Sequence, residues 1–205
     1  MLDIKCYRGE AAPLDKRPFL TIVTRAYKKP KCLQHCIASV EKQTDSDYEH
    51  IILEDMVGQG LAWADQLLDM KKDLNHGKFI LVLDDDDELT NHGFISLLKF
   101  LDKQYDPGLI IWRGYFSEID YALPPIDYRF STTPARGLIG SFNYCARKEL
   151  YDKHVHLCNS GIAGDYDFLM AMYNELPRDK IHWLRKILVR TQQKSFGKAM
   201  DRKDE

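Results

Sequence analysis

Residues 78–87 read KFILVLDDDD, a short apolar run that changes abruptly into four adjacent aspartates. The run over 78–83 has the length and composition of a buried strand. Four neighbouring carboxylates repel one another, and a divalent cation such as Mg²⁺ or Mn²⁺, which prefers oxygen ligands, would remove that conflict. The alternative is a solvated acidic turn that caps the next helix. The pattern favours a metal or nucleotide site at the end of a strand.

Two similar units precede this strand. The β-branched run over 19–24 predicts a first strand, and Pro30 suits the first turn of the helix after it. The run over 48–53 predicts a second strand, followed by an amphipathic helix that Gly77 would end. Strand and helix thus alternate, which is the pattern of an α/β protein with a parallel sheet.

The ends of these three strands carry the candidate chemistry. Ligands of parallel α/β sheets bind beyond the carboxyl ends of the strands. The strands end in polar, mostly charged residues, namely Thr24-Arg25, Glu54-Asp55 and Asp84 to Asp87. We therefore expect these side chains along one rim of the sheet.

The second half of the chain is less regular. Residues 109–113 and 181–190 predict two further strands. Residues 117–136 are expected to form a long loop, and 138–145 a strand in which Gly140 permits a close approach.

Two predicted helices have candidate capping residues. Thr90 or Asn91 can cap the helix that follows the acidic residues. Asp165 can cap a later helix, which would stabilise it by about 1 kcal/mol and is the structural alternative to any chemical role for this residue.

Composition limits the class of protein. The chain has 205 residues, 44% of them hydrophobic and 29% charged, which suits a soluble globular domain. The net charge of -2 does not favour nucleic acid as a partner, and no apolar stretch approaches the roughly 20 residues needed to span a bilayer. Five cysteines without a CxxC pair support neither a disulfide framework nor a zinc site, and reduced thiols indicate a cytoplasmic location.

The domain organisation follows from the lack of any internal repeat or linker. We expect a single domain over 1–205, with an extended lead-in over 1–17 and a disordered polar tail over 194–205.

Four segments, in order, resemble the nucleotide-sugar glycosyltransferases of GT-A type, and among them the large family-2 group. They are FLTIVTRAYKKPKCLQHCIASVEKQT (19–44), YEHIILED (48–55), GKFILVLDDDDEL (77–89) and GDYDF (164–168). The resemblance runs over roughly residues 18–195. It implies a Rossmann-like nucleotide-binding GT-A domain with a central, mostly parallel mixed sheet flanked by helices.

The resemblance also implies roles for particular residues. Asp165 would be the general base. Asp84 and Asp86 would be the acids of a DxD metal motif, with Asp86 the direct ligand of Mn²⁺ or Mg²⁺. Asp55 would accept a hydrogen bond from the nucleobase of the donor, a uracil. The residues that would bind the nucleotide sugar are Thr24, Arg25, Tyr27, Asp55, Asp84 and Asp85.

Some positions depart from the family pattern. The opening turn usually reads Pro-Thr-Tyr-Asn, where this chain has Thr24-Arg25-Ala26-Tyr27. The residue before the implied base is Gly164 rather than Glu, and Gln192 stands where relatives often carry a His that contacts the metal or diphosphate.

The activity implied is metal-dependent transfer of a sugar, of the hexosyl type, from a UDP-sugar to an acceptor hydroxyl on a glycan or other molecule, with inversion. Two other classes stay open. A nucleotidyltransferase would normally show a glycine-rich loop after the first strand, and residues 25–31 contain no glycine. A non-catalytic nucleotide-sugar-binding module would keep Asp55 and the acidic residues without needing Asp165.

Overall fold

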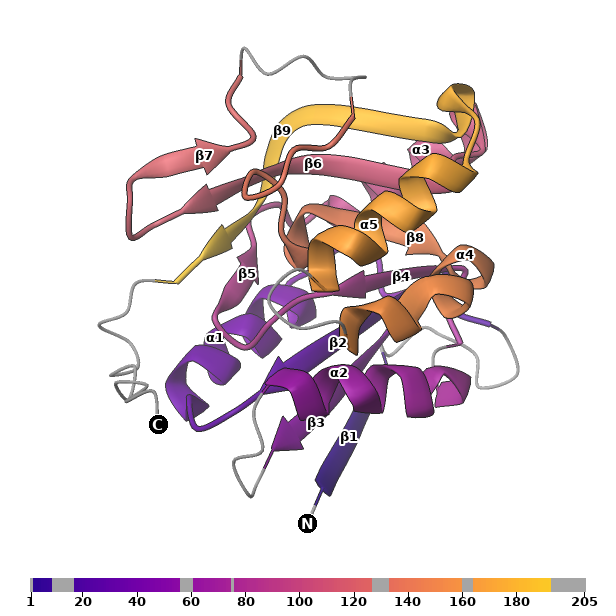
Figure 1. Ribbon diagram of the computed structural model, residues 1–205. Helices are drawn as coiled ribbons and strands as arrows, with labels where there is room; N and C mark the ends of the chain where they lie inside the picture. The colour runs from indigo at the N-terminus through magenta and orange to yellow at the C-terminus, as the bar shows by residue number, and fades with distance from the viewer. Residues whose placement is uncertain are drawn as a thin grey trace.

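The computed structural model describes residues 2–8, 17–55, 61–74, 76–126, 133–159 and 164–192. These residues form a nine-stranded mixed sheet with helices on both faces (Figure 1). The strand order is β1-β3-β2-β4-β8-β6-β9-β5, with β7 paired to β6. The strands are β1 (Leu2–Arg8), β2 (Leu20–Ala26), β3 (Tyr48–Asp55), β4 (Phe79–Val82), β5 (Asp87–Leu89), β6 (Leu109–Phe116), β7 (Tyr121–Leu123), β8 (Tyr144–Arg147) and β9 (Ile181–Thr191). The helices are α1 (Pro30–Glu41), α2 (Leu61–Met70), α3 (Phe94–Tyr105), α4 (Lys148–His154) and α5 (Gly164–Glu175).

The first half of the sheet has the parallel arrangement that the sequence predicted. β2 lies between β3 and β4 and is parallel to both. The expected lead-in over 1–17 is in part a strand, because β1 pairs antiparallel with β3 and covers the edge of the sheet. The polar tail lies outside the described residues.

The second half of the sheet is mostly antiparallel. The pairing of β6 with β9 is parallel, whereas β8 runs antiparallel to both β4 and β6, and β5 runs antiparallel to β9. The sheet is therefore mixed, as expected, but it is not mostly parallel. Among the described strands three pairings are parallel, β2–β3, β2–β4 and β6–β9, and five are antiparallel.

Two predictions for this half were wrong in detail. Part of the expected loop over 117–136 is β7, which forms a hairpin with β6. The expected strand over 138–145 begins only at Tyr144, after a 3₁₀ turn. Nothing approaches Gly140 closely, since a Cβ built there would lie 3.5 Å from its nearest atom; the close approach is at Gly114, where a Cβ would lie 2.2 Å from the ring of Phe142.

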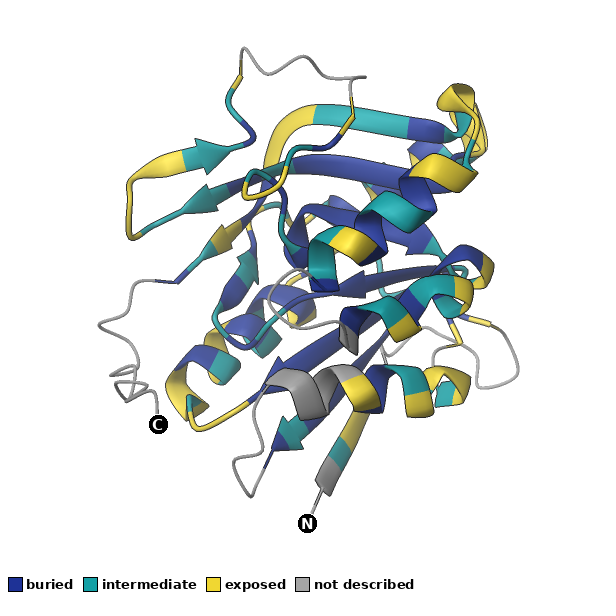
Figure 2. Ribbon diagram, viewed as in Figure 1, coloured by how far each residue is buried: buried dark blue, intermediate teal, exposed yellow. Residues whose placement is uncertain are grey.

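Apolar side chains from both faces of the sheet build two cores, and Figure 2 shows the buried strands between exposed outer helix faces. One core packs α2, α4 and α5 against the sheet, and the other packs α1 and α3 against its opposite face. Each fully buried Leu, Ile or Phe side chain stabilises the folded state by about 1.5–3 kcal/mol. The two cores therefore hold the strands, and with them the strand ends, in place. None of the described helices combines the length and hydrophobicity needed to cross a membrane.

The helix starts differ in part from the predicted caps. Pro30 is the first residue of α1, as expected. At the start of α3 the N–H of Gly93 donates to Oδ1 of Asn91 at 2.8 Å, so one of the two expected side chains does act there. The N–H of Phe94 donates to Oε1 of Gln43 at 3.1 Å, so a side chain from a distant segment shares this role. Asp165 is not a cap but lies within the first turn of α5.

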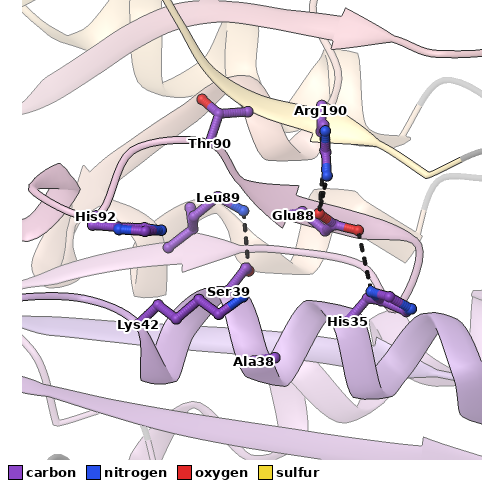
Figure 3. A pocket seen from close by; sticks show the side chains of 9 residues that line it. All are labelled: His35, Ala38, Ser39, Lys42, Glu88, Leu89, Thr90, His92 and Arg190. Carbon is purple, nitrogen blue, oxygen red and sulfur yellow. Dashed lines mark hydrogen bonds and ion pairs between the residues drawn. The ribbon is translucent and has the colours of Figure 1, made fainter.

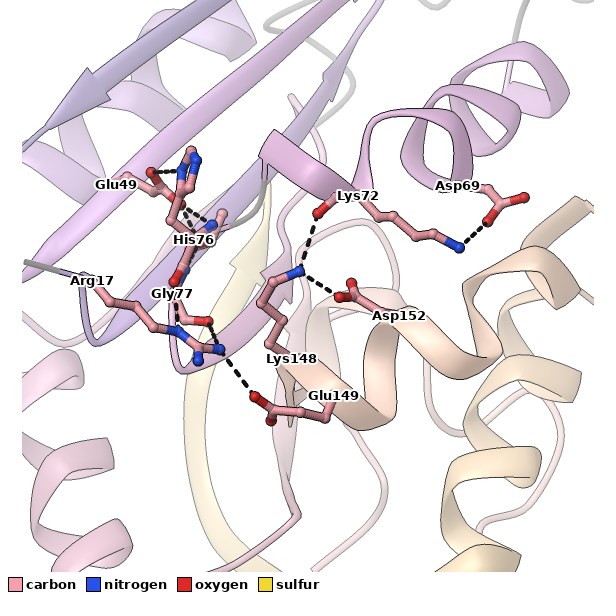
Figure 4. Close-up of polar contacts among 10 residues, drawn as sticks. Arg17, Glu49, Asp69, Lys72, His76, Gly77, Lys148, Glu149 and Asp152 are labelled. Atoms are coloured by element: carbon pink, nitrogen blue, oxygen red, sulfur yellow. Dashed lines mark hydrogen bonds and ion pairs between the residues drawn. The ribbon is translucent and has the colours of Figure 1, made fainter.

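A buried carboxylate ties together the amino ends of β2, β3 and β4. Glu49 accepts hydrogen bonds from the hydroxyl of Thr21 at 2.5 Å and from the N–H of His76 at 2.6 Å (Figure 4). Gly77, expected to end a helix, instead lies against β2, because a Cβ there would be 2.3 Å from the backbone nitrogen of Thr21. This network fixes the register of the strands whose other ends carry the candidate chemistry.

Candidate active site

The carboxyl ends of β2, β3 and β4 meet along one edge of the sheet. Arg25 lies opposite Leu53, and the N–H of Asp85 donates to the carbonyl of Arg25 at 3.2 Å, which extends the β2–β4 pairing. Two segments leave this edge, residues 84–87 (the acidic loop) and residues 25–29 (the basic turn). The contacts between them confirm the expectation that these strand ends share one rim.

The first contact between the two segments is a bidentate ion pair. Nε of Arg25 donates to Oδ1 of Asp84 at 2.6 Å, and Nη2 donates to Oδ2 at 2.7 Å. The Arg25 side chain is only 5% exposed and that of Asp84 is 23% exposed. Because the planar guanidinium matches a carboxylate with two parallel hydrogen bonds, both oxygens of Asp84 are engaged.

The next contacts come from Tyr27 and Lys29. The N–H of Tyr27 donates to Oδ2 of Asp85 at 2.9 Å. Nζ of Lys29 lies 2.5 Å from Oδ2 of Asp86 and 3.7 Å from Oδ1 of Asp85. Burial lowers the pKa of Lys29, but Asp86 and Asp85 outweigh that effect and the pKa is raised. Lys29 therefore carries its charge at neutral pH.

The remaining repulsion within the acidic loop is reduced by protonation, because burial favours the neutral form of Asp85 and Asp87. Burial raises the pKa of Asp85 to about 7, although a hydrogen bond and a nearby cation oppose the rise. Burial, with the charges of Asp84 and Asp86, also raises the pKa of Asp87 well above its ordinary range. Oδ2 of Asp87 accepts from the N–H of Asp84 at 3.2 Å, which closes the turn. Near pH 7 the loop is thus less negative than four aspartates would suggest.

Asp165 reaches the same edge from α5. Its Oδ1 lies 4.0 Å from Nη1 of Arg25, and its side chain is 43% exposed. Burial raises the pKa of Asp165, the charge of Arg25 opposes the rise, and that of Asp84 adds to it. A partly exposed carboxylate with a raised pKa, beside other charged groups, has the properties of a general base.

Two neighbours of the site were not singled out in the sequence, Lys29 and Tyr144. Burial raises the pKa of Tyr144 well above its ordinary range, and the charges of Cys158 and Asp165 raise it further. Lys29 could have been identified from the sequence, because Arg25, Tyr27 and Lys29 alternate at the end of β2 and just beyond it. No comparable signal existed for Tyr144, because its neighbours come from distant segments.

Thr24 does not face this site. Its side chain is fully buried, and its hydroxyl lies 2.7 Å from Nε2 of His50 and 3.6 Å from Sγ of Cys36 in α1. Adjacent strand residues point to opposite faces, so Thr24 cannot line a pocket with Arg25 through its side chain. The side chain of Thr24 therefore does not support the predicted nucleotide contact, which stays a prediction.

Asp55 and Tyr27 lie at the expected edge in different environments. Asp55 ends β3 and is 5% exposed, while Tyr27 is 37% exposed. The ammonium of Lys28 lies 4.9 Å from the centre of the Tyr27 ring. Both residues stay candidates for nucleotide contact.

Gln192 fastens the acidic loop to the end of β9. Its N–H donates to the carbonyl of Asp86 at 2.7 Å, and its Nε2 donates to the carbonyl of Cys32 at 2.9 Å. The residue is 6% exposed, and its buried Oε1 has no hydrogen-bond partner among the described residues.

The arrangement does not fit a divalent metal ion at the DxD motif. Both oxygens of Asp84 accept from Arg25, and Oδ2 of Asp86 accepts from Lys29. Across the described ranges, no three His, Cys, Asp or Glu residues form a group that could hold a metal ion. The predictions of Asp84 and Asp86 as metal ligands, and of Mn²⁺ or Mg²⁺ as cofactor, are thus untested, and the contacts of the two carboxylates do not support them.

A cavity of about 280 Å³ lies apart from these residues, between α1, β5 and β9 (Figure 3). Glu88 crosses it, accepting from Nη2 of Arg190 at 2.8 Å, with Nδ1 of His35 at 4.0 Å. None of the predicted site residues lines this cavity.

No protein-family model matches the chain, and no curated protein matches its sequence. Solved structures share its fold. TarS of S. aureus (residues 1–349) in complex with UDP superposes with a TM-score of 0.67 at 14% identity, covering 85% of this chain and 60% of that one. The same TarS fragment with UDP-GlcNAc gives a TM-score of 0.65 at 14% identity, covering 85% and 58%. Mannosyltransferase PcManGT from Pyrobaculum calidifontis, with GDP-Man and Mn²⁺, gives 0.60 at 12% identity, covering 88% and 58%.

These likenesses show that the chain has the GT-A fold of nucleotide-sugar glycosyltransferases, the fold that the sequence predicted. The chain spans about 60% of the length of the TarS fragment.

Proposed function

We propose that the chain is a glycosyltransferase that moves a sugar, of the hexosyl type, from a UDP-sugar to an acceptor hydroxyl, with inversion. The observation that carries this proposal is the position of Arg25. Its guanidinium lies between Asp84 of the acidic loop and Asp165 of α5, at 2.6 and 4.0 Å. A candidate base and a candidate diphosphate site thus share one edge of a GT-A sheet.

The similar structures support the donor class. TarS was solved with UDP and with UDP-GlcNAc, and the mannosyltransferase with GDP-Man. Within this class we assign uridine to the present chain on the resemblance, with Asp55 as the residue that would contact the base.

In the proposed reaction Asp165 takes the proton of the acceptor hydroxyl as the oxygen attacks the sugar. A base whose pKa is raised toward the working pH abstracts a proton more effectively than an ordinary aspartate. A single carboxylate opposite the leaving group gives in-line displacement and hence inversion.

The leaving diphosphate needs positive charge, since negative charge develops on it in the transition state. Arg25 and Lys29 are the cations that contact the acidic loop. The metal dependence expected from the acidic motif is untested, and the pairing of Asp84 with Arg25 and of Asp86 with Lys29 does not support it.

A donor screen tests the proposal. A ligand at 100 times its Kd stabilises a protein by about 2.7 kcal/mol, so uridine diphosphate sugars should raise the melting temperature clearly. We expect Asp55→Asn to weaken that shift and Glu54→Gln, which alters the neighbouring carboxylate, to preserve it. A shift with guanosine or thymidine donors alone would contradict the uridine assignment. No shift with any nucleotide sugar would contradict the proposed function.

A further inference from the structure

The basic turn and the acidic loop are joined by three successive contacts: Arg25 to Asp84, the N–H of Tyr27 to Asp85, and Lys29 to Asp86. Each is a hydrogen bond from a donor of one segment to a carboxylate of the other. Two of the donors carry a full positive charge. The acidic loop is therefore already neutralised by side chains of the same chain.

We propose that Arg25 and Lys29 are internal cations that take the place of a divalent ion at this loop, and that Lys29 competes with Mn²⁺ for Asp86. It follows that a nucleoside diphosphate binds here without added metal. This second statement rests on the proposed function, whereas the competition between Lys29 and Mn²⁺ does not.

The two cations differ in how readily they can be displaced. The Arg25 side chain is 5% exposed and engages both oxygens of Asp84, so an ion cannot reach that carboxylate without breaking a buried bidentate pair. The side chains of Lys29 and Asp86 are 33% and 43% exposed. Lys29 is thus the exchangeable cation, and Asp86 is the carboxylate that an ion from solvent can reach.

The carboxylate of Asp86 cannot bind the ammonium of Lys29 and a metal ion at the same oxygen. Nζ of Lys29 lies 2.5 Å from Oδ2 of Asp86, so a metal ion and the ammonium cannot share that oxygen. Nζ of Lys29 also lies 3.7 Å from Oδ1 of Asp85, so its removal would take a positive charge away from a second, buried carboxylate as well.

The decisive experiment is a Mn²⁺ titration followed by electron paramagnetic resonance, which reports free Mn²⁺ and needs no enzymatic activity. Wild type is compared with Lys29→Met and with Lys28→Met. Lys28 is the matched control, because it is adjacent and carries the same charge but lies over the Tyr27 ring. We expect Lys29→Met to bind Mn²⁺ about tenfold more tightly or better, the effect of removing one nearby positive charge at intermediate dielectric. Lys28→Met should match wild type.

Equal Mn²⁺ affinity in wild type and Lys29→Met would overturn the competition, as would an equal gain in Lys28→Met. Adding Asp86→Asn to Lys29→Met should remove the gain, which assigns it to this carboxylate, and a gain that persists would overturn the assignment. Circular dichroism of each variant confirms that it is folded.

A second arm measures UDP binding by calorimetry in EDTA. We expect wild type to bind UDP without metal, and Lys29→Met to bind it more weakly. Binding that requires Mn²⁺ would overturn the metal-free statement. If UDP fails to bind with or without Mn²⁺, the proposed function fails, and the Mn²⁺ titration still decides the role of Lys29.

Discussion

Arg25 illustrates how one buried cation organises several acids. A buried charge is costly unless it is paired and hydrogen-bonded, and Asp84 supplies both conditions. Removing Arg25 would leave Asp84 with unpaired charge at a half-buried position, so its loss would disturb structure as well as chemistry. For that reason Lys29, which is partly exposed, is the better residue to alter when the chemistry of the loop is tested.

His50 gives a prediction for stability against pH. It is 1% exposed, and burial lowers its pKa to about 4, against about 6.5 in an unfolded chain. The unfolded state therefore binds more protons between these values, and stability is lost as the pH falls from about 6.5 toward 4. The difference corresponds to about 3 kcal/mol.

Denaturant unfolding at several pH values checks this expectation. Wild type should lose about 3 kcal/mol more than His50→Gln between pH 7 and pH 4, because glutamine can bond the hydroxyl of Thr24 without titrating. If the free energy of unfolding of the two proteins changed equally with pH, His50 would not titrate as its burial requires.

For single residues, the sequence identified most of the candidate site but not which cation pairs with which carboxylate. Arg25, Asp84, Asp85 and Asp86 were identified because they end strands of a parallel sheet. Repulsion within the acidic loop has two solutions, a metal ion or internal cations, and sequence spacing does not show which lysine of 28 and 29 meets Asp86. Nor does the spacing show that Arg25, rather than its neighbour Thr24, turns its side chain toward the acidic loop.

Among the elements, the packing of β4 beside β2 requires a glycine at position 77, just before β4. A Cβ at this position would lie 2.3 Å from the backbone nitrogen and 2.7 Å from the hydroxyl of Thr21, and backbone atoms cannot move aside as a flexible side chain can. The same hydroxyl accepts the N–H of Gly77 and donates to Glu49, so a shift would also disturb the buried carboxylate.

We expect Gly77→Ala to lower the free energy of unfolding by about 1–3 kcal/mol, the typical range when buried sites are overpacked. Gly140→Ala is the control, because its φ of -105° suits alanine and its nearest atom is 3.5 Å away. The control should be unchanged or more stable by up to about 1 kcal/mol. Similar effects for both substitutions would contradict the close approach at Gly77.

The elements of the first half could be predicted from sequence because each is a local pattern with its own end signals. The second half could not be predicted equally well. β7 has only three residues, and β8 is short and is stabilised by pairing with β4 and β6, which are far along the chain. Part of the start of α3 was missed for a similar reason, because Gln43, which accepts the N–H of Phe94, lies far back along the chain, just after α1.

In the whole molecule, the sheet order brings together segments that the sequence keeps apart. β8 joins β4 to β6 and places Tyr144 beside α5, and Arg25 in β2 approaches Asp165 at the start of that helix. The sequence alone offered Asp165 two roles, a helix cap or a general base. The structure places it inside the first turn and next to Arg25, which leaves the second role as the one to test.

The most direct test measures release of nucleoside diphosphate from the donor found in the screen, for wild type, Asp165→Asn and Asp167→Asn. Asp167 is the matched control, because it lies in the same first turn of α5 with its side chain exposed. If Asp165 is the base, Asp165→Asn should keep donor binding and lose about 100-fold or more in kcat, while Asp167→Asn stays near wild type. Turnover by Asp165→Asn at the wild-type rate would contradict the account.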